Sequence, residues 1–585
     1  MKKAKALLLA ICVALACTGS IFGATSVSKA QATAEFKKLM MELFADEAES
    51  DSISLNYLLA QPENYGITPP PPAYPQVGVE YINSALKRYK AVLDRLNKID
   101  PKKLYQEDLL TYKTVKLTLE DQLKFSDYVY FVEYLSPSLG LQAQLPVLLA
   151  EYNFRSKDDI EDYLELLGQT SSLFKEISAF EKEKKENGLF LSKDMALAVI
   201  SQCEEFIKDP QSNVLITFVS DKIAKVSGLS QTEIEAYREM NKKAVLESFI
   251  PAYRQLINDL KALNVGNERT GSLASHPDYK EYYSLFVQSS TNSSRTIPQM
   301  QTLMASAWDY STKWLDLNSV KEISVLDITT KSPEEILVSL KKSITADFPP
   351  MKSVDNQLEY VHNSLENYLS PAFYLMPAID SYTDSSIYIN RASLSSRSGS
   401  WLFTTLAHEG YPGHLYQNVY FRQTNPDPVR SVMSFTGYSE GWAVYCELLS
   451  YKYCAANTMA AESLRNYAIR NYALYGMTDI GVNYYGWTLD ELSSFLASHG
   501  VASRSAASGM YNLVLEDPGN YLNYTIGFLE MNALREKAEK ALGNRFIAKE
   551  FHKLVLTTGP TWFDLLEAEV NSWIAQQKAE LKGVS

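Results

Sequence analysis

Apolar residues recur at intervals of three and four along most of this 585-residue chain. This spacing places them on one face of an α-helix, and that face must then be buried against other helices. The pattern is clear in residues 32–62, 80–99, 105–125 and 157–188. The chain therefore predicts an all-α protein, and its length allows more than one lobe.

One short segment has a different pattern. Residues 384–393, DSSIYINRAS, alternate in polarity and contain β-branched and aromatic side chains, which is typical of a strand. GITPPPPAYPQ at residues 66–76 predicts a rigid extended connection. Ser332 and Glu335 form a capping-box pattern that predicts a helix start. We therefore expect a helical fold with a small β element at 384–393, and this strand could offer its edge to an extended peptide.

The N-terminus has the pattern of a signal peptide. Three lysines at positions 2, 3 and 5 precede the apolar run ALLLAICVALA, which is too short to span a bilayer comfortably. Residues 14–16 and 28–30 are both possible cleavage sites, and Cys17 directly after the first could carry a lipid anchor. We expect a signal peptide in residues 1–30 and a mature protein that is extracellular or at the cell surface.

Charge and cysteine content exclude some functions. Residues 1–30 contain four lysines and no acid, so their removal changes the net charge from −13 to −17. This disfavours nucleic acid and an electrostatic hold on anionic lipid, and no later stretch is apolar enough to span a membrane. After Cys17 only Cys203, Cys446 and Cys454 remain, which is no disulfide framework. The last two are eight positions apart in a helical stretch, which is about 12 Å and too far for a bond.

The segment LAHEGYPGHLYQ nearly matches the zinc-peptidase pattern H-E-x-x-H. His408 and His414 are six residues apart, so a straight helix would leave them about 120° apart around its axis. Pro412 cannot donate a helical hydrogen bond to the His408 carbonyl, and Gly413 permits unusual torsions. This Pro-Gly pair predicts a kink that turns His414 back towards a metal shared with His408.

A third ligand is expected from the segment SEGWAVYCELL. Ser439 is a candidate N-cap, and Glu440 and Glu447 are seven residues apart, on one face of the helix that follows. A buried carboxylate is costly unless it pairs with a cation. Glu440 is therefore the expected ligand, and Glu447 could orient a ligand histidine. The alternative is a surface His-Glu pair without metal. The other histidines are interpreted as surface or helix-capping residues: His276, His362, His499 and His552.

HEGYPGHLYQ followed by SEGWAVYCE resembles the bacterial family called domain of unknown function 885, whose hallmarks are H-E-x-x-P-G-H-x-x-Q and E-G-W-A-x-Y-x-E. The resemblance covers residues 35–580 approximately, including YGMTDIGVNYYGWTLDEL. The family is similar to the helical zinc metallopeptidases of the gluzincin group. This implies one Zn²⁺ per chain, with His408, His414 and Glu440 as ligands and Glu409 as general base. It also implies a two-lobed metallopeptidase-like fold around a channel, with lobes at 31–250 and 251–585.

Further site residues are hypotheses. Asn483 stands where many relatives carry histidine; it can donate a hydrogen bond but cannot carry a proton through a catalytic cycle. We expect Asn483 and Tyr484 to contact substrate. Tyr524 is a candidate oxyanion donor, with a core tyrosine as the alternative. Three arginines are possible partners for a substrate carboxylate: Arg391, Arg397 and Arg470.

These features favour a zinc-dependent peptidase that hydrolyses short peptides, with Glu409 taking a proton from the attacking water. Two other classes stay open. One is a metal-dependent hydrolase of an ester or a non-peptide amide. The other is a non-catalytic peptide-binding surface protein, which the presence of a base at Glu409 disfavours.

Overall fold

The computed structural model describes most of the chain. The expected signal segment up to residue 27, which includes Cys17, lies outside the described residues, and so do His362 and Arg397. The described residues are 28–137, 139–318, 323–361, 366, 370–382, 384–394 and 399–579.

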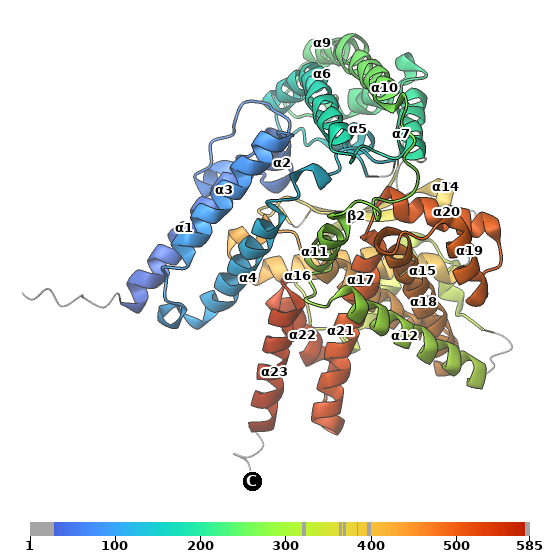
Figure 1. Cartoon of the computed structure of the whole chain (residues 1–585). Coiled ribbons are helices and arrows are strands. Elements are labelled where there is room, and N and C mark those ends of the chain that lie inside the picture. Colours follow the sequence, from blue (N-terminus) through green and yellow to red (C-terminus); the bar gives the residue numbers. More distant parts are fainter. Residues whose placement is uncertain are drawn as a thin grey trace, which may run out of the picture.

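Helices form three neighbouring groups (Figure 1). The N-terminal helices pack around a core of their own that includes Phe36, Phe44 and Val115. Val429 from the C-terminal part also belongs to this core, so the first group is attached to the third. The N-terminal helices are α1 (Lys29–Ala48), α2 (Ser52–Leu58), α3 (Val79–Leu96) and α4 (Gln106–Gln122).

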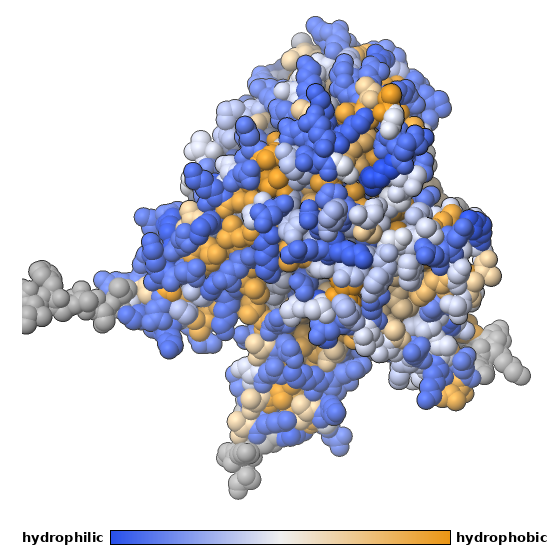
Figure 2. Space-filling model, viewed as in Figure 1, coloured by the Kyte–Doolittle hydropathy of each residue, from blue (hydrophilic) through white to orange (hydrophobic). Residues whose placement is uncertain are grey.

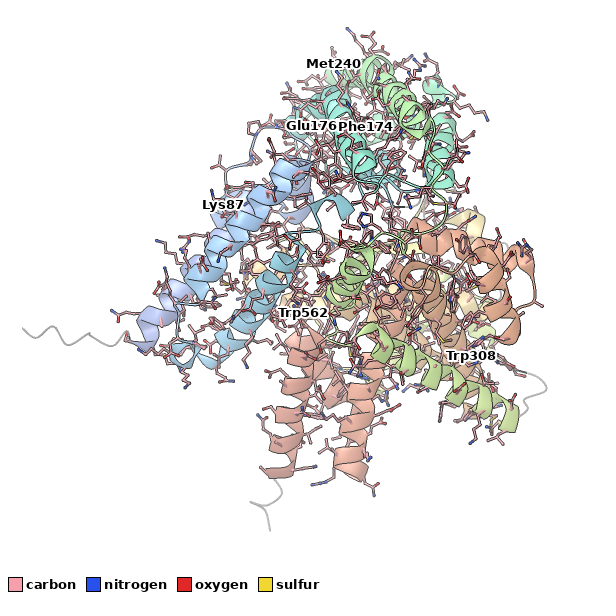
Figure 3. The ribbon with its side chains drawn as sticks, in the orientation of Figure 1. Lys87, Phe174, Glu176, Met240, Trp308 and Trp562 are labelled. Carbon is pink, nitrogen blue, oxygen red and sulfur yellow. The ribbon has the colours of Figure 1, made fainter. Side chains whose placement is uncertain are left out.

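The second group is a bundle at the top of Figure 1. Its amphipathic pattern is visible on α6, where Phe174 is buried and Glu176 is exposed (Figure 3). The expected division of the lobes at residue 250 falls at the start of α10. However, α10 packs on α6 and α7, so this bundle continues to Asn264. Its helices are α5 (Leu141–Glu151), α6 (Lys157–Glu186), α7 (Lys193–Phe206), α8 (Val214–Ile223), α9 (Gln231–Ala244) and α10 (Ile250–Asn264).

The third group contains the predicted motifs. It comprises α11 (Tyr279–Thr291), α12 (Ile297–Asn318), α13 (Pro333–Ser343), α14 (Arg391–Leu394), α15 (Gly399–Glu409), α16 (His414–Gln423), α17 (Thr436–Cys454), α18 (Thr458–Asp479), α19 (Leu489–Ser498), α20 (Arg504–Glu516), α21 (Asn520–Leu542), α22 (Ala548–Thr558) and α23 (Phe563–Ala579). The capping box of Ser332 and Glu335 at the start of α13 is present as predicted.

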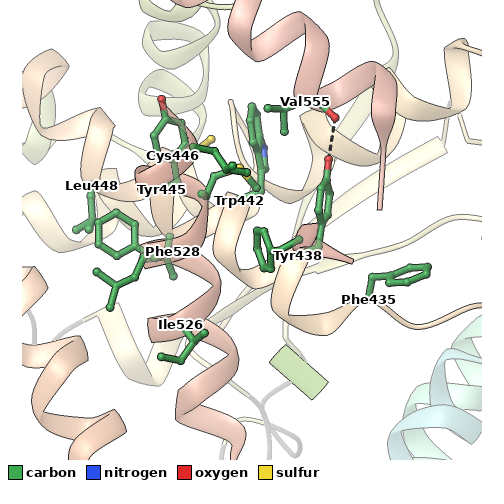
Figure 4. Close-up of a cluster of buried hydrophobic side chains, with 14 of the residues drawn as sticks. Phe435, Tyr438, Trp442, Tyr445, Cys446, Leu448, Ile526, Phe528 and Val555 are labelled. Atoms are coloured by element: carbon green, nitrogen blue, oxygen red, sulfur yellow. Dashed lines mark hydrogen bonds between the residues drawn. The ribbon is translucent and has the colours of Figure 1, made fainter. Parts of the chain in front are cut away.

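Helix α17 lies at the centre of this group, against α21. A Cβ atom on Gly441 would lie 2.3 Å from the Gly527 carbonyl carbon, so the two backbones approach as closely as glycine allows. Figure 4 shows the hydrophobic cluster around α17, in which the Tyr438 hydroxyl donates to the Val555 carbonyl at 2.9 Å. This packing fixes the helix that carries Glu440 and Glu447.

The start of α17 differs from the prediction. The helix begins at Thr436, three residues before the expected N-cap Ser439. The Tyr438 N–H, which a local cap would satisfy, instead donates to the Asn292 side chain at 3.1 Å. A contact from a distant element therefore replaces the local capping signal.

The small β element is a three-stranded sheet in the order β1-β3-β2, with β1 (Asp355–Tyr360), β2 (Ala372–Leu375) and β3 (Asp384–Ile389). The predicted strand is β3, which is confirmed. It pairs parallel with β1 and antiparallel with β2. The expectation that it offers a free edge is wrong, because both of its edges are paired. The sequence did not predict the other two strands. The β1 sequence, DNQLEY, is too polar for a strand pattern, and the β2 sequence, AFYL, is too short.

The surface seen in Figure 2 is mainly hydrophilic, with hydrophobic patches where the N-terminal helices meet the upper bundle. Among the described residues, no helix is both long enough and apolar enough to cross a membrane. The cysteines Cys203, Cys446 and Cys454 are buried and free, as expected from the low cysteine count and from the spacing of the last two.

Candidate metal centre

The break between α15 and α16 brings the two motif histidines together. Helix α15 ends at Glu409 and α16 begins at His414. Between them the Gly413 N–H donates to the Ala407 carbonyl at 2.9 Å. A Cβ atom on Gly413 would lie 1.7 Å from the His408 carbonyl oxygen, so only glycine fits. The His408 and His414 ring centres are 4.9 Å apart, which is the outcome that the Pro-Gly pair predicted.

Glu440 on α17 completes a group of three candidate ligands. Its Oε2 atom lies 3.5 Å from Nε2 of His408 and 3.5 Å from Nε2 of His414. One ligand atom from each of the three residues lies within 4.8 Å of the others. Ligands about 2.1 Å from a tetrahedral zinc ion lie roughly 3.4 Å from one another. The spacing and the His-His-Glu set therefore fit a zinc-like dication.

The charges in this group also suit a cation. Glu440 Oε2 is buried and has no hydrogen-bond partner in the part of the chain that the structure describes. Burial opposes ionisation of Glu440, but His414 and His408 outweigh it and hold its pKa well below the ordinary value. Burial alone would lower the pKa of His408, yet Glu440 and Glu447 raise it. An ion at this point would satisfy the unpaired carboxylate oxygen.

Glu447 lies behind His408. His408 Nδ1 is 3.1 Å from Glu447 Oε2, and the Tyr472 hydroxyl donates to the same oxygen at 2.9 Å. A carboxylate on Nδ1 fixes the ring and leaves Nε2 as the available ligand atom. Glu447 thus contacts the ring nitrogen of His408 that Glu440 does not, and its orienting role stays a prediction. Trp442, on the same helix, donates to the Pro412 carbonyl at 2.9 Å and holds the break in place.

Glu409 directs its carboxylate towards β2. The Tyr374 N–H donates to Glu409 Oε2 at 2.9 Å. This backbone amide of β2 therefore faces the candidate metal centre and does not bond to β3. Burial raises the pKa of Glu409, and the charges of His408 and His414 partly offset this. A raised pKa makes a carboxylate a stronger base. The arrangement suits the general-base role expected for Glu409.

Tyr524 on α21 lies beside the same histidine. Its ring centre is 6.4 Å from that of His408. Burial, then the charges of Glu440 and Glu409, raise the pKa of Tyr524 well above its ordinary value. The hydroxyl therefore keeps its proton and remains a hydrogen-bond donor.

Asn483 and Tyr484 lie elsewhere. Asn483 is fully buried, and its amide nitrogen donates to Asp479 at 3.0 Å and to the Val514 carbonyl at 2.7 Å. The donors that were expected to contact substrate are thus used inside the protein. Tyr484 packs 6.2 Å from the Tyr283 ring, with the Lys280 ammonium 5.5 Å above its own ring. The structure does not bring either residue to the cavity beside His414.

Two of the candidate arginines also lie outside that cavity. Arg391 is exposed and lies over the Tyr360 ring at 3.8 Å. Arg470 lies over the Trp308 ring at 4.4 Å. Their guanidinium groups are thus stacked on aromatic rings, and neither residue lines the cavity beside His414.

The remaining described histidines take structural roles, with one correction. His499 lies at the end of α19, with Nδ1 2.8 Å from the Phe495 carbonyl, and His276 Nδ1 accepts from the Asp278 N–H at 3.3 Å. His552 is not a surface or capping residue, since it is fully buried between the Tyr445 hydroxyl and the Asp347 carbonyl, each at 2.7 Å. Burial lowers the pKa of His552 to about 3.

A cavity of about 530 Å³ adjoins the candidate metal centre. His414 and Glu440 form part of its wall, together with Gln417, Arg422 and Arg430. A second cavity of about 840 Å³ shares Arg422 and Arg430 with the first and extends to α1 and α4. Sequence reasoning missed these three residues. The sequence did carry two signals for Gln417, which ends the hallmark H-E-x-x-P-G-H-x-x-Q and lies one turn after His414 on the same face of α16.

The fold and site define a class: a helical protein with a half-buried His-His-Glu cluster beside a large cavity. The chain belongs to the family of bacterial proteins of unknown function DUF885, whose model matches residues 72–308 and 327–570. No curated protein matches the chain.

Two solved structures share this fold. One is a protein from Colwellia psychrerythraea described as a "putative lipoprotein", with a TM-score of 0.80 and 19% identity over 94% of this chain and 100% of that chain. The other is a protein of unknown function from Shewanella oneidensis, also described as a "putative lipoprotein", with a TM-score of 0.56 and 15% identity over 92% and 99%. At these identities the likeness establishes the fold.

Proposed function

We propose that this protein is an exported zinc-dependent peptidase that acts on short peptides. The observation that carries the proposal is the cluster of His408, His414 and Glu440 with a half-buried carboxylate, Glu409, directly beside it. Three nitrogen and oxygen ligands with an adjacent base are the set that hydrolytic zinc sites use. The proposal agrees with the similarity between this family and gluzincin-type helical metallopeptidases that the motifs suggest.

When bound, the metal ion supplies a Lewis acid that polarises the scissile carbonyl and makes a water molecule more acidic. Glu409, held by the Tyr374 N–H, accepts the proton of the attacking water and delivers it to the leaving nitrogen as the C–N bond breaks. The protonated Tyr524 hydroxyl donates to the carbonyl oxygen as negative charge develops there. Glu447 keeps the His408 ring in one orientation throughout.

The substrate approaches beside β2. Within the part of the chain that the structure describes, this strand pairs with β3 on one side only, and its Tyr374 N–H donates to Glu409. An extended peptide can align with such a free edge, where side chains alternate between the two faces. The two joined cavities accept an unfolded segment, whereas a folded domain would not enter them. We therefore propose short peptides as substrates.

Export is proposed from the N-terminal segment. Its lysines and apolar run have the signal-peptide pattern, and Cys17 directly follows a possible cleavage site. The description of both structural relatives as "putative lipoprotein" is consistent with a lipid on this cysteine.

The experiment combines zinc quantification with digestion of a mixed peptide library. Wild type and Glu409→Gln should each hold about one zinc ion, and only wild type should cleave peptides. Glu409→Gln is a suitable control because it keeps the side-chain size and the Tyr374 contact but cannot accept a proton. A zinc-loaded wild type that cleaves no peptide would refute the peptidase and favour an ester or non-peptide amide hydrolase. Equal cleavage by both proteins would refute the role of Glu409.

A further inference from the structure

The cavity beside the metal residues runs along one face of α16. His414, Gln417, Asn418 and Phe421 are spaced by three and four residues, which places them on the same side of the helix, and all of them line the cavity. Arg422 follows on this wall, about 12 Å from His414 along the helix axis at ~1.5 Å per residue. The face of α16 therefore leads from the metal centre to an arginine.

Arg422 has no acidic partner. Its guanidinium donates to the Ser431 hydroxyl, and no carboxylate of the described residues lies within ion-pair distance of it. Burial lowers the pKa of Arg422 to about 10, and the nearby Tyr374 and Tyr65 raise it only in part. A buried charge without a counterion costs free energy. An anionic ligand would remove that cost.

Arg430 lies on the same wall and is only 6% exposed. One nitrogen, Nη2, donates to the Thr558 carbonyl at 3.0 Å and the Pro560 carbonyl at 2.6 Å. Its Nε has no hydrogen-bond partner among the described residues, and the same holds for the amide nitrogen of Gln417, which is 4% exposed. Two buried donors without acceptors thus lie in the wall that Arg422 shares.

Charge and hydropathy along the cavity define what binds there. Beyond the arginines, the second cavity is lined by four acids, which disfavour an anion: Glu107, Asp108, Asp380 and Asp427. On the metal side, the wall also contains apolar side chains: Met376, Phe421, Val432, Met433 and Phe435. An anion is therefore favoured at the arginines and an apolar group is favoured next to it.

We propose that Arg422, assisted by Arg430, binds the C-terminal carboxylate of a peptide with an apolar residue at or near that end. Gln417 donates to a backbone carbonyl between the arginines and the metal centre. An extended chain covers the distance from His414 to Arg422 with about three to four residues at ~3.4 Å each. The inference rests on the proposed peptidase and names its substrate class: short peptides with a free C-terminus, cut near that end.

The test measures binding, so that it does not depend on hydrolysis. Zinc-loaded Glu409→Gln is titrated calorimetrically with a peptide that ends in phenylalanine, once as the free acid and once as the C-terminal amide. We expect the acid to bind at least tenfold more tightly, because a charge-assisted bond to a half-buried guanidinium without a carboxylate partner is strong. In Glu409→Gln/Arg422→Gln the two peptides should bind within twofold of each other. Arg504→Gln, which removes an equal charge from the surface of α20, should keep the preference.

Three outcomes would overturn the inference. The first is equal binding of acid and amide without the Arg422 substitution. The second is a preference that survives Arg422→Gln. The third is an amidated peptide with an internal glutamate that binds as tightly as the free acid, because this would assign the arginines to an acidic side chain. Thermal melts identify a misfolded variant, and Arg422→Lys, which keeps the charge, should then show an intermediate preference.

The result is separable from the proposed function. An acid preference in a protein whose wild type cleaves no peptide would refute the peptidase and keep the carboxylate site. Cleavage of acid and amide at the same rate by wild type would keep the peptidase and refute the site.

Discussion

Replacing Glu447 with alanine should weaken zinc binding without abolishing it. The substitution removes the acceptor that lies 3.1 Å from His408 Nδ1 and 2.9 Å from the Tyr472 hydroxyl, but it leaves the three ligands in place. Loss of such an outer partner costs about 10–100-fold in metal affinity, or roughly 1.4–2.7 kcal/mol. Glu447→Gln keeps a carbonyl oxygen in reach of His408, so this variant should lose about tenfold in zinc affinity or less.

The assay is a titration of each apo protein with zinc in competition with a chromogenic chelator at fixed pH. Glu440→Ala provides the comparison for loss of a ligand. Glu536→Ala controls for loss of an exposed acid on α21. An affinity for Glu447→Ala as low as that for Glu440→Ala would mean that Glu447 is itself a ligand. An affinity equal to that of wild type would refute the orienting role.

Other changes test the packing, the charges and the N-terminus. Gly441→Ala should lower the free energy of unfolding by about 1–3 kcal/mol or more in urea denaturation, because its Cβ meets the Gly527 backbone. Gly509→Ala, which has open space around its Cβ, should not lower it. A Gly441→Ala protein as stable as wild type would refute the close helix contact. Burial, Asp479 and Glu516 raise the pKa of Asp517 to about 7. The folded state then holds a proton that the unfolded state releases, so stability should fall as pH rises from about 4 to about 7. Asp517→Asn should flatten this dependence in thermal melts, and an unchanged slope would contradict the assignment. Intact mass of native protein should show the loss of at least residues 1–16; an unprocessed chain would refute export, and an N-terminus after residue 17 without acyl mass would exclude the lipid.

The parts of the fold that follow from local signals could be predicted from the sequence. Apolar spacing predicted the long helices, such as α6, and the Ser332–Glu335 capping box marked the start of α13. The break at Pro412–Gly413 was predictable because both residues restrict their own backbone. These features depend on residues that are neighbours along the chain.

The features that the sequence did not predict depend on distant contacts. Helix α17 starts early because Asn292, far away in sequence, accepts from its Tyr438 N–H. His552 is in a helix with charged neighbours, and only the tertiary structure encloses it. Arg422 carries no motif, and its position beside the metal residues follows from the direction of α16 after the break. A pattern along the chain cannot show which elements meet in space.

The most direct test of the metal centre is the zinc content of purified wild type and His414→Ala, measured by mass spectrometry of the metal after dialysis. His414 is the ligand whose role depends on the break between α15 and α16, since a straight helix would turn it away from His408. The structure leads us to expect about one zinc ion per wild-type chain and almost none in a folded His414→Ala protein. Full zinc content in His414→Ala would contradict the His408, His414 and Glu440 site.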